Sequence, residues 1–484
     1  MKPPATLENS HAISLLPLCV DLDGTVVRSD TLLEGIFALP FNGRLLWCFA
    51  GLLSGRVVFK KRVAESATLD PTLLPYNQEL LAYLQEQKAA GRTLILVTAA
   101  DITMARLVAN HLGIFDQVIA SDGAENVKGR AKAAILSSRF GEKGFVYAGN
   151  SRADLPVWRA ANSAVIVNAS RGVAGAARRT GEVETQIDER PSRFAGILRA
   201  MRPQQWIKNV LIFVPIITAH AVRDVSGWIH AIYAFLAFCA TASCIYLLND
   251  LSDLRADRRH PRKRKRPFAA GMVPLQFGVL IAVLLLSVGL ELASLGKILL
   301  IILIYAVMSI AYSAKLKEMP LVDVFMLAAL YTIRLFGGGQ SSGYAVSFWL
   351  LSFSNFIFLS LALVKRVAEL KAVGPGESNI ARRGYRHIDT LILQMFGCGS
   401  ALAASLVLAL FVQAEATAGR YASPGLLWGL VPLILFWQFR LWLATTRGNM
   451  RDDPITYAAG DWVTWLVGGA SLAILAAAKS LTFH

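Results

Sequence analysis

The sequence predicts an α/β domain of the Rossmann type with a small helical cap, followed by an all-α integral membrane domain of nine transmembrane helices. Two observations lead to this prediction. The 484 residues are 55% hydrophobic with a mean hydropathy of +0.48, which is too apolar for an ordinary soluble protein. The apolar character is also uneven, because residues up to about 195 look globular and long apolar stretches recur after them.

The net charge of +16 is compatible with nucleic-acid binding, but the position of the charge argues against it. The inner loops between the predicted spans hold 18 Lys and Arg, and the outer loops hold three. This asymmetry follows the positive-inside rule. Together with a polar N-terminus that lacks a signal-peptide pattern, it predicts a multi-pass protein of the inner (cytoplasmic) membrane. The N-terminal domain and the active sites would then face the cytoplasm. The five cysteines show neither metal nor disulfide spacing.

In the N-terminal domain, a short apolar run over residues 15–20 predicts a buried strand, and it ends in the letters DLDGT. This places the carboxylates of Asp21 and Asp23 in a loop at the carboxyl end of the strand, where open α/β sheets bind ligands. One carboxylate could attack a phosphorus atom, and the other could act as acid and base toward the leaving group.

Three further segments continue the pattern. A second strand over residues 93–97 ends at Thr98, a helix begins at Lys132, and a strand over 145–148 leads into GNSRADLPVW. This order resembles the haloacid dehalogenase (HAD) phosphatase superfamily over roughly residues 15–170. The resemblance implies that Asp21 is the nucleophile, Asp23 the general acid and base, Thr98 a phosphate ligand and Lys132 the neutralising cation, with Lys128 as the alternative lysine.

The resemblance also implies a magnesium site formed by Asp21, Asp23, Asn150 and Asp154. The chain departs from the family here, because Asn150 stands where the motif GDxxxD has an aspartate. An amide oxygen can bind Mg²⁺, but one negative charge is lost. An active phosphatase and a disabled scaffold therefore both remain open.

We expect the domain boundaries to divide the chain into an HAD-like domain over 1–170, a linker over 171–198 and a membrane domain over 199–484. The cap would occupy about residues 32–87. Within it, residues 43–63 are apolar with basic ends, so this stretch could rest on the membrane surface or pack as the core of the cap.

The nine predicted spans are 208–221, 228–248, 275–291, 297–313, 321–338, 345–364, 388–412, 424–444 and 463–482. The stretch 249–271 follows the second of them. Its side chains Asn249, Asp250, Asp253 and Asp257 are followed or interleaved by eight Lys or Arg, and positions 249, 253 and 257 would share one helix face. Carboxylates hold Mg²⁺ and cations hold phosphate oxygens, so the stretch predicts a magnesium pyrophosphate site. A positive-inside loop and a solvated helix end are the alternatives.

Five motifs in order resemble the UbiA-type membrane prenyltransferase superfamily: RPQQWIKN at 202–209, NDLSDLRAD at 249–257, YSAKLKEMPLVD at 312–323, VKRVAEL at 364–370 and RGNMRDDP at 447–454. The continuation HPRKRKRPFAAG at 260–271 and VKRVAEL resemble the decaprenyl-phosphate phosphoribosyltransferase branch. The second motif of the family usually has more acidic residues than this chain keeps. In addition, Arg334 lies inside an apolar span, where a cation usually has a functional or pairing role.

From this resemblance we expect metal binding by Asn249, Asp250, Asp253 and Asp257, with Asp250 and Asp253 also catalytic. We expect phosphate or substrate binding by Lys208, His260, Lys263, Arg266, Tyr312, Lys315, Lys317, Asp323, Arg334, Lys365, Arg366, Glu369, Arg447 and Asp461. The neighbouring residues Arg382, Arg383, Asp452 and Asp453 belong to the same inner loops.

The resemblance implies a Mg²⁺-dependent transfer of 5-phosphoribose from phosphoribosyl pyrophosphate (PRPP) to a polyprenyl phosphate, with release of pyrophosphate. The HAD-like domain would then remove the 5-phosphate of the product. The expected partners are PRPP, the lipid and the membrane, with no nucleic acid, and a homo-oligomer is compatible with them. One alternative is prenyl transfer from a prenyl diphosphate to an aromatic acceptor, with an inactive HAD-like domain. Another is a transporter with a regulatory phosphatase-like domain, although the sequence shows no convincing repeat.

Overall fold

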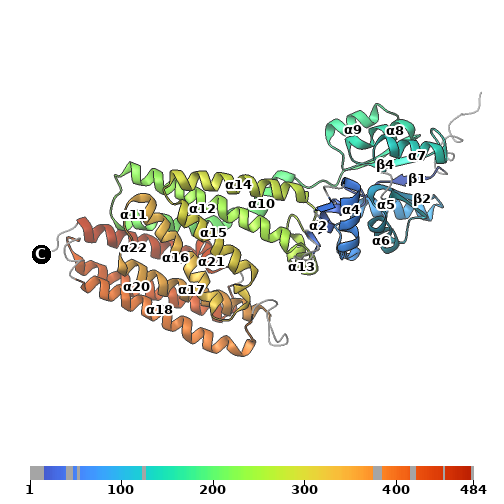
Figure 1. Cartoon of the computed structure of the whole chain (residues 1–484). Helices are drawn as coiled ribbons and strands as arrows, with labels where there is room; N and C mark the ends of the chain where they lie inside the picture. Colours follow the sequence, from blue (N-terminus) through green and yellow to red (C-terminus); the bar gives the residue numbers. More distant parts are fainter. Residues whose placement is uncertain are drawn as a thin grey trace, which may run out of the picture. The chain divides into compact units, whose positions relative to one another are not determined.

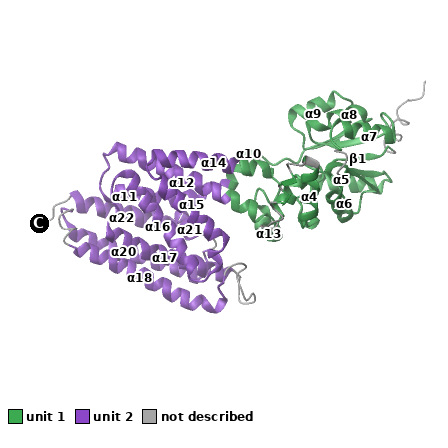
Figure 2. Cartoon of the chain, in the orientation of Figure 1, with its two compact units in different colours: residues 1–200, 247–280 green, residues 201–246, 281–484 purple. Residues whose placement is uncertain are grey.

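The computed structural model describes residues 16–39, 47–48, 50–51, 55–122, 127–373, 384–414, 421–450 and 453–480. The chain forms two compact units (Figure 2). Unit 1 contains residues 1–200 and 247–280, and unit 2 contains residues 201–246 and 281–484. Unit 1 therefore includes the aspartate-rich stretch that follows the second predicted span.

A parallel sheet of six strands forms the centre of unit 1 (Figure 1). Its strands are β1 (Leu18–Val20), β2 (Leu94–Asp101), β3 (Gln117–Ser121), β4 (Val146–Gly149), β5 (Ser163–Val167) and β6 (Glu182–Ile187), in the order β3-β2-β1-β4-β5-β6. In the central strand, Leu18 and Val20 belong to one apolar cluster and Cys19 to another, so both faces of the sheet are buried. The predicted α/β fold is confirmed, and the central strand ends directly before Asp21.

The helices of unit 1 flank this sheet and form the cap. They are α2 (Thr31–Phe37), α4 (Arg56–Ser66), η2 (Pro71–Leu73), α5 (Gln78–Ala89), α6 (Ile102–Leu112), α7 (Arg130–Phe140), η3 (Arg152–Asp154), α8 (Leu155–Ala160), α9 (Arg171–Arg178) and α10 (Arg193–Met201). Helices α2 and α4 pack together in the cap. Helix α5 lies in the stretch expected as cap, but its Leu80 and Leu84 are buried in the same cluster as strand β1. It is therefore a helix of the sheet layer.

Two expectations about this unit change in the structure. The segment expected as a linker over 171–198 contains α9 and β6, because β6 pairs in parallel with β5 and Ile187 enters the core. The apolar stretch 43–63 lies partly outside the described residues. In its described part, Phe59 and Val63 are buried with Leu39 and Cys48, which is the cap-core alternative.

The described residues that follow α10 form helices joined by turns and loops. These helices are η4 (Pro203–Phe213), α11 (Val214–Thr218), α12 (Val225–Ser252), α13 (Leu254–Arg259), η5 (Lys263–Lys265), α14 (Leu275–Leu295), α15 (Leu299–Ala314), η6 (Leu316–Glu318), α16 (Val322–Ser342), α17 (Phe348–Val373), η7 (His387–Asp389), α18 (Thr390–Gln413), η8 (Pro424–Gly429), α20 (Leu430–Thr446), α21 (Pro454–Gly460) and α22 (Trp462–Ser480).

Within the described residues, seven helices are long and apolar enough to cross a membrane. Helix α15 is apolar but shorter, with 16 residues. The segment expected to span at 208–221 forms the 3₁₀ helix η4 and the five-residue α11, where Pro215 provides no backbone N–H. The helical membrane domain is thus confirmed, and the count of nine spans stays a prediction.

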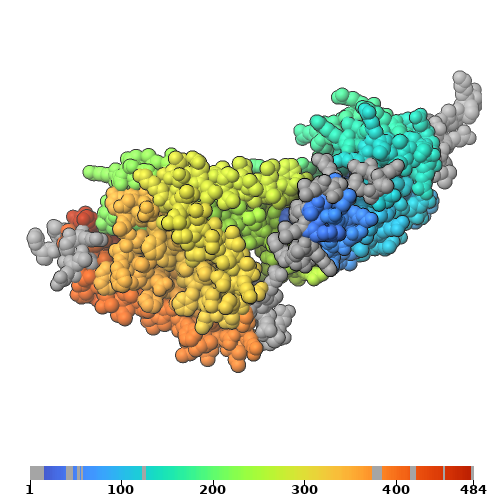
Figure 3. Space-filling model, in the orientation of Figure 1, coloured from blue at the N-terminus to red at the C-terminus, as the bar shows by residue number. Residues whose placement is uncertain are grey.

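Helix α17 packs against both α16 and α18 (Figure 1), and Figure 3 shows the side chains on one outer face of these helices. The glycine run of α16 allows a close approach to η4. A Cβ atom at Gly338 would lie 2.1 Å from the carbonyl oxygen of Ile212, so a larger residue has no room there.

Candidate functional sites

The first candidate site is a cavity of about 650 Å³ at the carboxyl ends of β1, β2 and β4 in unit 1. Its lining includes Asp21, Asp23, Thr98, Lys132 and Asp154. These residues come from separate parts of the sequence, and the parallel strand order brings them to the same edge of the sheet.

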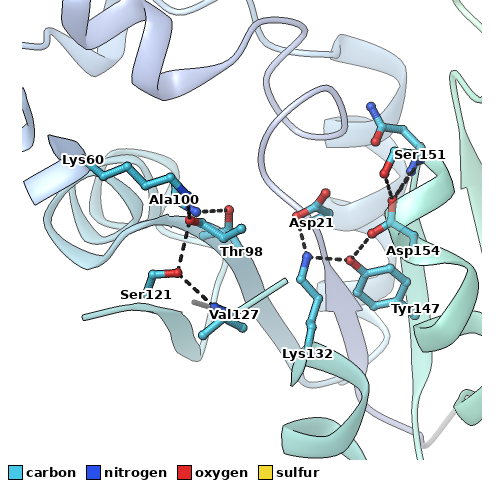
Figure 4. Close-up of polar contacts among 12 residues, drawn as sticks. Asp21, Lys60, Thr98, Ala100, Ser121, Val127, Lys132, Tyr147, Ser151 and Asp154 are labelled. Carbon is cyan, nitrogen blue, oxygen red and sulfur yellow. Dashed lines mark hydrogen bonds and ion pairs between the residues drawn. The ribbon is translucent and has the colours of Figure 1, made fainter. Parts of the chain in front are cut away.

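A chain of polar contacts crosses this cavity (Figure 4). Lys132 Nζ lies 2.8 Å from Asp21 Oδ1 and donates to the hydroxyl of Tyr147, also at 2.8 Å. The Tyr147 hydroxyl donates in turn to Asp154 Oδ1 at 2.9 Å. Lys132 is buried on α7, whereas Lys128 is exposed at the cavity rim. The geometry therefore places Lys132 beside the expected nucleophile.

The second aspartate lies against the start of the cap. Asp23 Oδ1 accepts a hydrogen bond of 2.8 Å from the backbone N–H of Thr31, the first residue of α2. Burial raises the pKa of Asp21 to about 6, and the nearby Lys132 opposes this rise. Burial, with the charge of Asp30 adding to it, raises the pKa of Asp23 to about 7. A carboxyl group that titrates near neutrality can both donate and accept a proton, as a general acid and base must.

The phosphate ligand expected at Thr98 is buried inside β2, which continues to Asp101. Its Oγ1 accepts from the N–H of Ala100 at 3.0 Å. Lys60 of α4 also lines the cavity and donates to the carbonyl of Ala99 at 2.9 Å (Figure 4). Burial lowers the pKa of Lys60, partly offset by Asp23 and Asp30. The sequence did not indicate this lysine, because it lies in the cap, outside the polar motifs that follow the strands.

The oxygen atoms around Asp21 suit magnesium. Asp154 Oδ2 accepts from the N–H groups of Asn150 and Ser151, and the Asn150 side chain lies over Gly24. A Cβ at Gly24, whose φ is +75°, would be 2.0 Å from Asn150 Nδ2. Among the described residues, no three His, Cys, Asp or Glu side chains lie close enough together to hold a metal. The Asn150 amide or main-chain and water oxygens would therefore have to complete the set, which is chemistry that Mg²⁺ accepts.

The second candidate site, the aspartate-motif loop of residues 249–271, also belongs to unit 1. Arg266 Nη1 contacts Asp250 Oδ1 at 3.1 Å and Asp257 Oδ2 at 2.6 Å, and both carboxylates are buried. Helix α12 ends at Ser252, yet Asp253 and Asp257 still donate backbone hydrogen bonds to the residues four positions earlier. The helical register therefore continues across the break, and two carboxylates lie near enough to share one cation.

Two residues of this loop that we expected to bind substrate lie away from Arg266 and its two carboxylates. His260 and Lys263 are exposed, and His260 Nδ1 accepts from the backbone N–H groups of Arg262 and Lys263 in a local turn. The structure does not bring them to the Arg266 cluster.

Unit 2 contains a buried group of cations. Lys208 Nζ and Lys365 Nζ both contact Asp453 Oδ2, at 2.8 and 3.0 Å. Lys208 also lies 5.7 Å from the ring centre of Tyr331, and Arg334 lies 5.8 Å from the same ring. Two lysines thus share one carboxylate, and a third cation lies against the same tyrosine ring as Lys208.

Arg334 is buried and has neutral partners. Its Nε donates to Asn209 Oδ1 at 2.8 Å, and its Nη2 lies 3.3 Å from the Tyr305 hydroxyl. The guanidinium also lies 5.8 Å from the ring centre of Phe238 and 5.1 Å from that of Tyr305. Within the part of the chain that the structure describes, no carboxylate forms an ion pair with it. A desolvated cation with only neutral partners is well placed to bind an anion.

Arg366 instead has a complete set of partners. Its Nε contacts Asp323 Oδ2 at 2.5 Å, its Nη1 contacts Glu369, and its Nη2 lies 3.0 Å from the Tyr312 hydroxyl. Asp323 also accepts from the Tyr385 hydroxyl, and both charged side chains of the Arg366–Asp323 pair are fully buried. The geometry brings four of the expected substrate residues together, but as a closed network that packs helices.

The remaining expected residues do not join these groups. Asp461 forms an ion pair with Arg440 and accepts from Thr464 at the start of α22, which is a local cap. Lys315 and Arg447 are exposed at the ends of α15 and α20, and Lys317 lies in the short helix η6. Arg382, Arg383 and Asp452 lie outside the described residues.

Sequence reasoning missed two members of these sites. Tyr147 looks like a core residue of a strand, yet its hydroxyl joins Lys132 to Asp154. Asp453 was visible only as part of a motif, and the lysines that it joins lie 245 and 88 residues away in the sequence. For Tyr147, the only local signal is a hydroxyl between the apolar residues Val146 and Ala148.

Comparison with known proteins identifies two families in the chain. The model of the UbiA prenyltransferase family matches residues 210–458, and the model of haloacid dehalogenase-like hydrolases matches residues 18–159. Uncharacterized protein y4nM of Sinorhizobium fredii is 38% identical over 94% of this chain and 89% of its own length. The decaprenyl-phosphate phosphoribosyltransferase of Corynebacterium glutamicum is 36% identical over 36% of this chain and 54% of its own length.

Among solved structures, a UbiA homolog from Archaeoglobus fulgidus bound to GPP and Mg²⁺ covers 58% of this chain and 99% of its own, with 17% identity and a TM-score of 0.45. The family models and the relatives in sequence show that the chain belongs to the UbiA prenyltransferase family, is homologous in part to decaprenyl-phosphate phosphoribosyltransferases, and carries an HAD-like domain in its N-terminal part.

Proposed function

We propose that this protein transfers 5-phosphoribose from PRPP to a polyprenyl phosphate, releases pyrophosphate, and then removes the 5-phosphate of the lipid product in its HAD-like domain. The observation that supports the transfer most strongly is the excess of buried cations in unit 2. Lys208 and Lys365 share one carboxylate, Asp453, and the buried Arg334 has only neutral partners. Buried cations in membrane domains are costly unless they serve a function.

This excess of positive charge separates the proposed substrates from the alternative. PRPP carries a 5-phosphate as well as its pyrophosphate, and the acceptor is itself an anionic lipid. An aromatic acceptor is neutral or nearly so and would need fewer cations. The partial homology to decaprenyl-phosphate phosphoribosyltransferases supports the same choice.

In the aspartate-motif loop, Asp250 and Asp257 would hold magnesium, and Arg266 would contact the pyrophosphate oxygens. Bound Mg²⁺ would lower the cost of the negative charge that develops on the leaving pyrophosphate. The two carboxylates already share one guanidinium in the structure, so a positive charge at this position is what their burial requires.

In the HAD-like domain, Asp21 would attack the phosphorus of the 5-phosphate and form an aspartyl phosphate. Asp23 would protonate the departing ribose oxygen and then take a proton from the water that hydrolyses the intermediate. Lys132 holds the Asp21 carboxylate in place at 2.8 Å. Asp21, Asn150 and Asp154 would hold magnesium, which supplies charge neutralisation for the phosphate.

The test is the transfer of label from ribose-labelled PRPP to a polyprenyl phosphate by the full chain in detergent with Mg²⁺. We expect label in the lipid fraction for the wild type, none for Asp250→Ala, and a lipid product that keeps its 5-phosphate for Asp21→Asn. Absence of labelled lipid from the wild type, across several chain lengths, would contradict the transferase proposal. Turnover of a prenyl diphosphate with an aromatic acceptor would then support the alternative.

A further inference from the structure

In unit 1, the aspartate-motif loop is locked to the cap of the HAD-like domain by one buried ion pair. Arg258 of α13 donates from Nη1 and Nη2 to the two carboxylate oxygens of Glu34 in α2, at 2.8 and 2.7 Å. The two side chains are only 6% and 3% exposed. Arg258 Nε also donates to the carbonyl of Ala269, so the guanidinium fixes the later part of its own loop as well. A bidentate pair of this kind determines both distance and orientation.

The segment that Arg258 fixes in this way continues into the wall of the phosphatase cavity. Gly271, Met272, Pro274 and Gln276 line the same cavity as Asp21. Gly271 has a φ of +67°, and a Cβ there would lie 3.0 Å from the side chain of Arg28. The segment therefore fits closely against the HAD-like domain only with glycine at this position.

This wall is also the beginning of a membrane helix. Helix α14 starts at Leu275 and is long and apolar enough to cross a bilayer. With α14 across a bilayer, a cavity that has the first turn of this helix in its wall would lie at the level of the lipid headgroups. Its volume of about 650 Å³ also suits a ligand larger than a sugar phosphate alone.

We propose that residues 271–276 form the part of the phosphatase cavity that recognises the lipid-linked portion of the substrate, and that Arg258 and Glu34 are positioning residues for this wall. The inference rests on the proposed function and adds a specificity determinant to it. Met272 and Pro274 supply apolar surface for the first part of the lipid chain, and Arg193 of α10 supplies a cation at the same rim for its phosphodiester. Soluble sugar phosphates would use only the Asp21 end.

The catalytic end of the cavity does not depend on this ion pair. Asp30 caps α2 through hydrogen bonds from the N–H groups of Leu32 and Leu33, and Thr31 binds Asp23. Loss of the Glu34 contact therefore leaves the start of α2 fixed. A variant of Glu34 can therefore change substrate recognition without disrupting the residues around Asp21 and Asp23.

The experiment compares phosphate release from two substrates by the full chain in detergent with Mg²⁺. One is a synthetic short-chain polyprenyl phosphodiester of ribose 5-phosphate, and the other is ribose 5-phosphate. For Arg258→Gln, Glu34→Gln and the double variant, we expect the KM for the lipid substrate to rise about tenfold in all three, because the two residues act as one unit. Their kcat/KM for ribose 5-phosphate should stay within about twofold of the wild type.

Asp70→Asn is the matched control, because it removes the exposed ion pair between the cap and Arg259 and leaves the turn at Thr72 intact. This variant should leave the KM and kcat/KM for both substrates unchanged. Met272→Ala tests the wall directly if the buried pair proves essential for folding, and it should raise the KM for the lipid substrate alone.

An unchanged KM for the lipid substrate would overturn the inference. An equal loss of kcat/KM with both substrates would overturn it too, and so would a double variant whose rise in KM equals the product of the rises in the two single variants. A wild type that hydrolyses neither substrate would instead contradict the proposed phosphatase. A wild type that hydrolyses both but forms no labelled lipid from PRPP would contradict the proposed transferase. These failures are therefore distinct.

Discussion

Magnesium should stabilise the HAD-like domain much more at about pH 8 than at about pH 5.5, because protons and the metal compete for the same buried carboxylates. Burial raises the pKa of Asp21 from its ordinary 3.8 to about 6, and that of Asp23 to about 7. The folded domain therefore binds these protons more tightly than the unfolded chain. The resulting stabilisation is fully present below about pH 4 and is lost as the pH rises through about 6 and 7.

For Asp21 alone, a rise of about two in pKa corresponds to about 3 kcal/mol of the free energy of unfolding. Without metal, the domain should lose this amount between acid and neutral pH. Magnesium would bind the ionised carboxylates and should restore stability at about pH 8, whereas at about pH 5.5 it would first have to displace protons. In Asp21→Asn, the contribution of Asp21 to the pH-dependent loss of stability should disappear, and so should its contribution to the stabilisation by magnesium.

The assay is hydrogen exchange of peptides that contain β1 and β4, measured on the full chain in detergent with either EDTA or Mg²⁺. These strands report on the HAD-like domain alone. Asp116→Asn, an aspartate of the same unit that pairs with Lys88 away from the cavity, serves as the control and should keep the full magnesium response. Equal protection by magnesium at both pH values, or an undiminished response in Asp21→Asn, would refute the reasoning.

Three further predictions concern the other networks. Asp453→Asn removes the carboxylate shared by the buried Lys208 and the partly buried Lys365, and it should lower ribose transfer from labelled PRPP about tenfold or more. Asp323→Asn leaves the buried Arg366 charge without its main partner and should cost about 3–5 kcal/mol, measured as a lower unfolding temperature in detergent. Gly24→Ala should abolish phosphate release and spare ribose transfer, because the new Cβ would lie 2.0 Å from the Asn150 amide and the backbone has a φ of +75°.

Each of these three predictions has an outcome that would contradict it. Normal transfer by Asp453→Asn would show that the shared carboxylate does not hold the lysines in a working position. Asp461→Asn, which affects only a local helix cap, is the control for Asp323→Asn. If both variants leave the unfolding temperature nearly unchanged, the buried network contributes no more to the stability of the fold than that cap does. Phosphate release by Gly24→Ala would show that the loop can move away from Asn150.

The sequence was informative wherever a local pattern determines the structure. The apolar run before Asp21 and the run before Gly149 could be predicted as strands, because short buried runs followed by polar loops are typical of parallel sheets. Since such strands end at the same edge, Asp21 and Asp154 could be expected at one site. Hydropathy likewise located α14 and most of the other long apolar helices to within a few residues, but α17 continues nine residues beyond the expected end at 364.

It was less informative where a residue's role depends on a distant partner. Asp323 looked like a ligand at the membrane boundary, but it lies buried against Arg366, 43 residues later. Glu34 carried no signal at all, because its partner Arg258 is 224 residues away. The expected linker was wrong in the same way, since β6 has the polar composition of an edge strand and is identified only by its pairing with β5.

The discontinuity of unit 1 has a consequence for the order of biosynthesis. Its last residues, 247–280, leave the ribosome only after residues 201–246 have been made, and these include most of the long helix α12. Until then Glu34 has no Arg258, and the face of the cap that will receive the loop remains open to water. The HAD-like domain can therefore collapse early, but it cannot reach its final packing before insertion of the chain into the membrane has begun. Complete packing of the HAD-like domain would thus be a sign that helix α12 has already been synthesised.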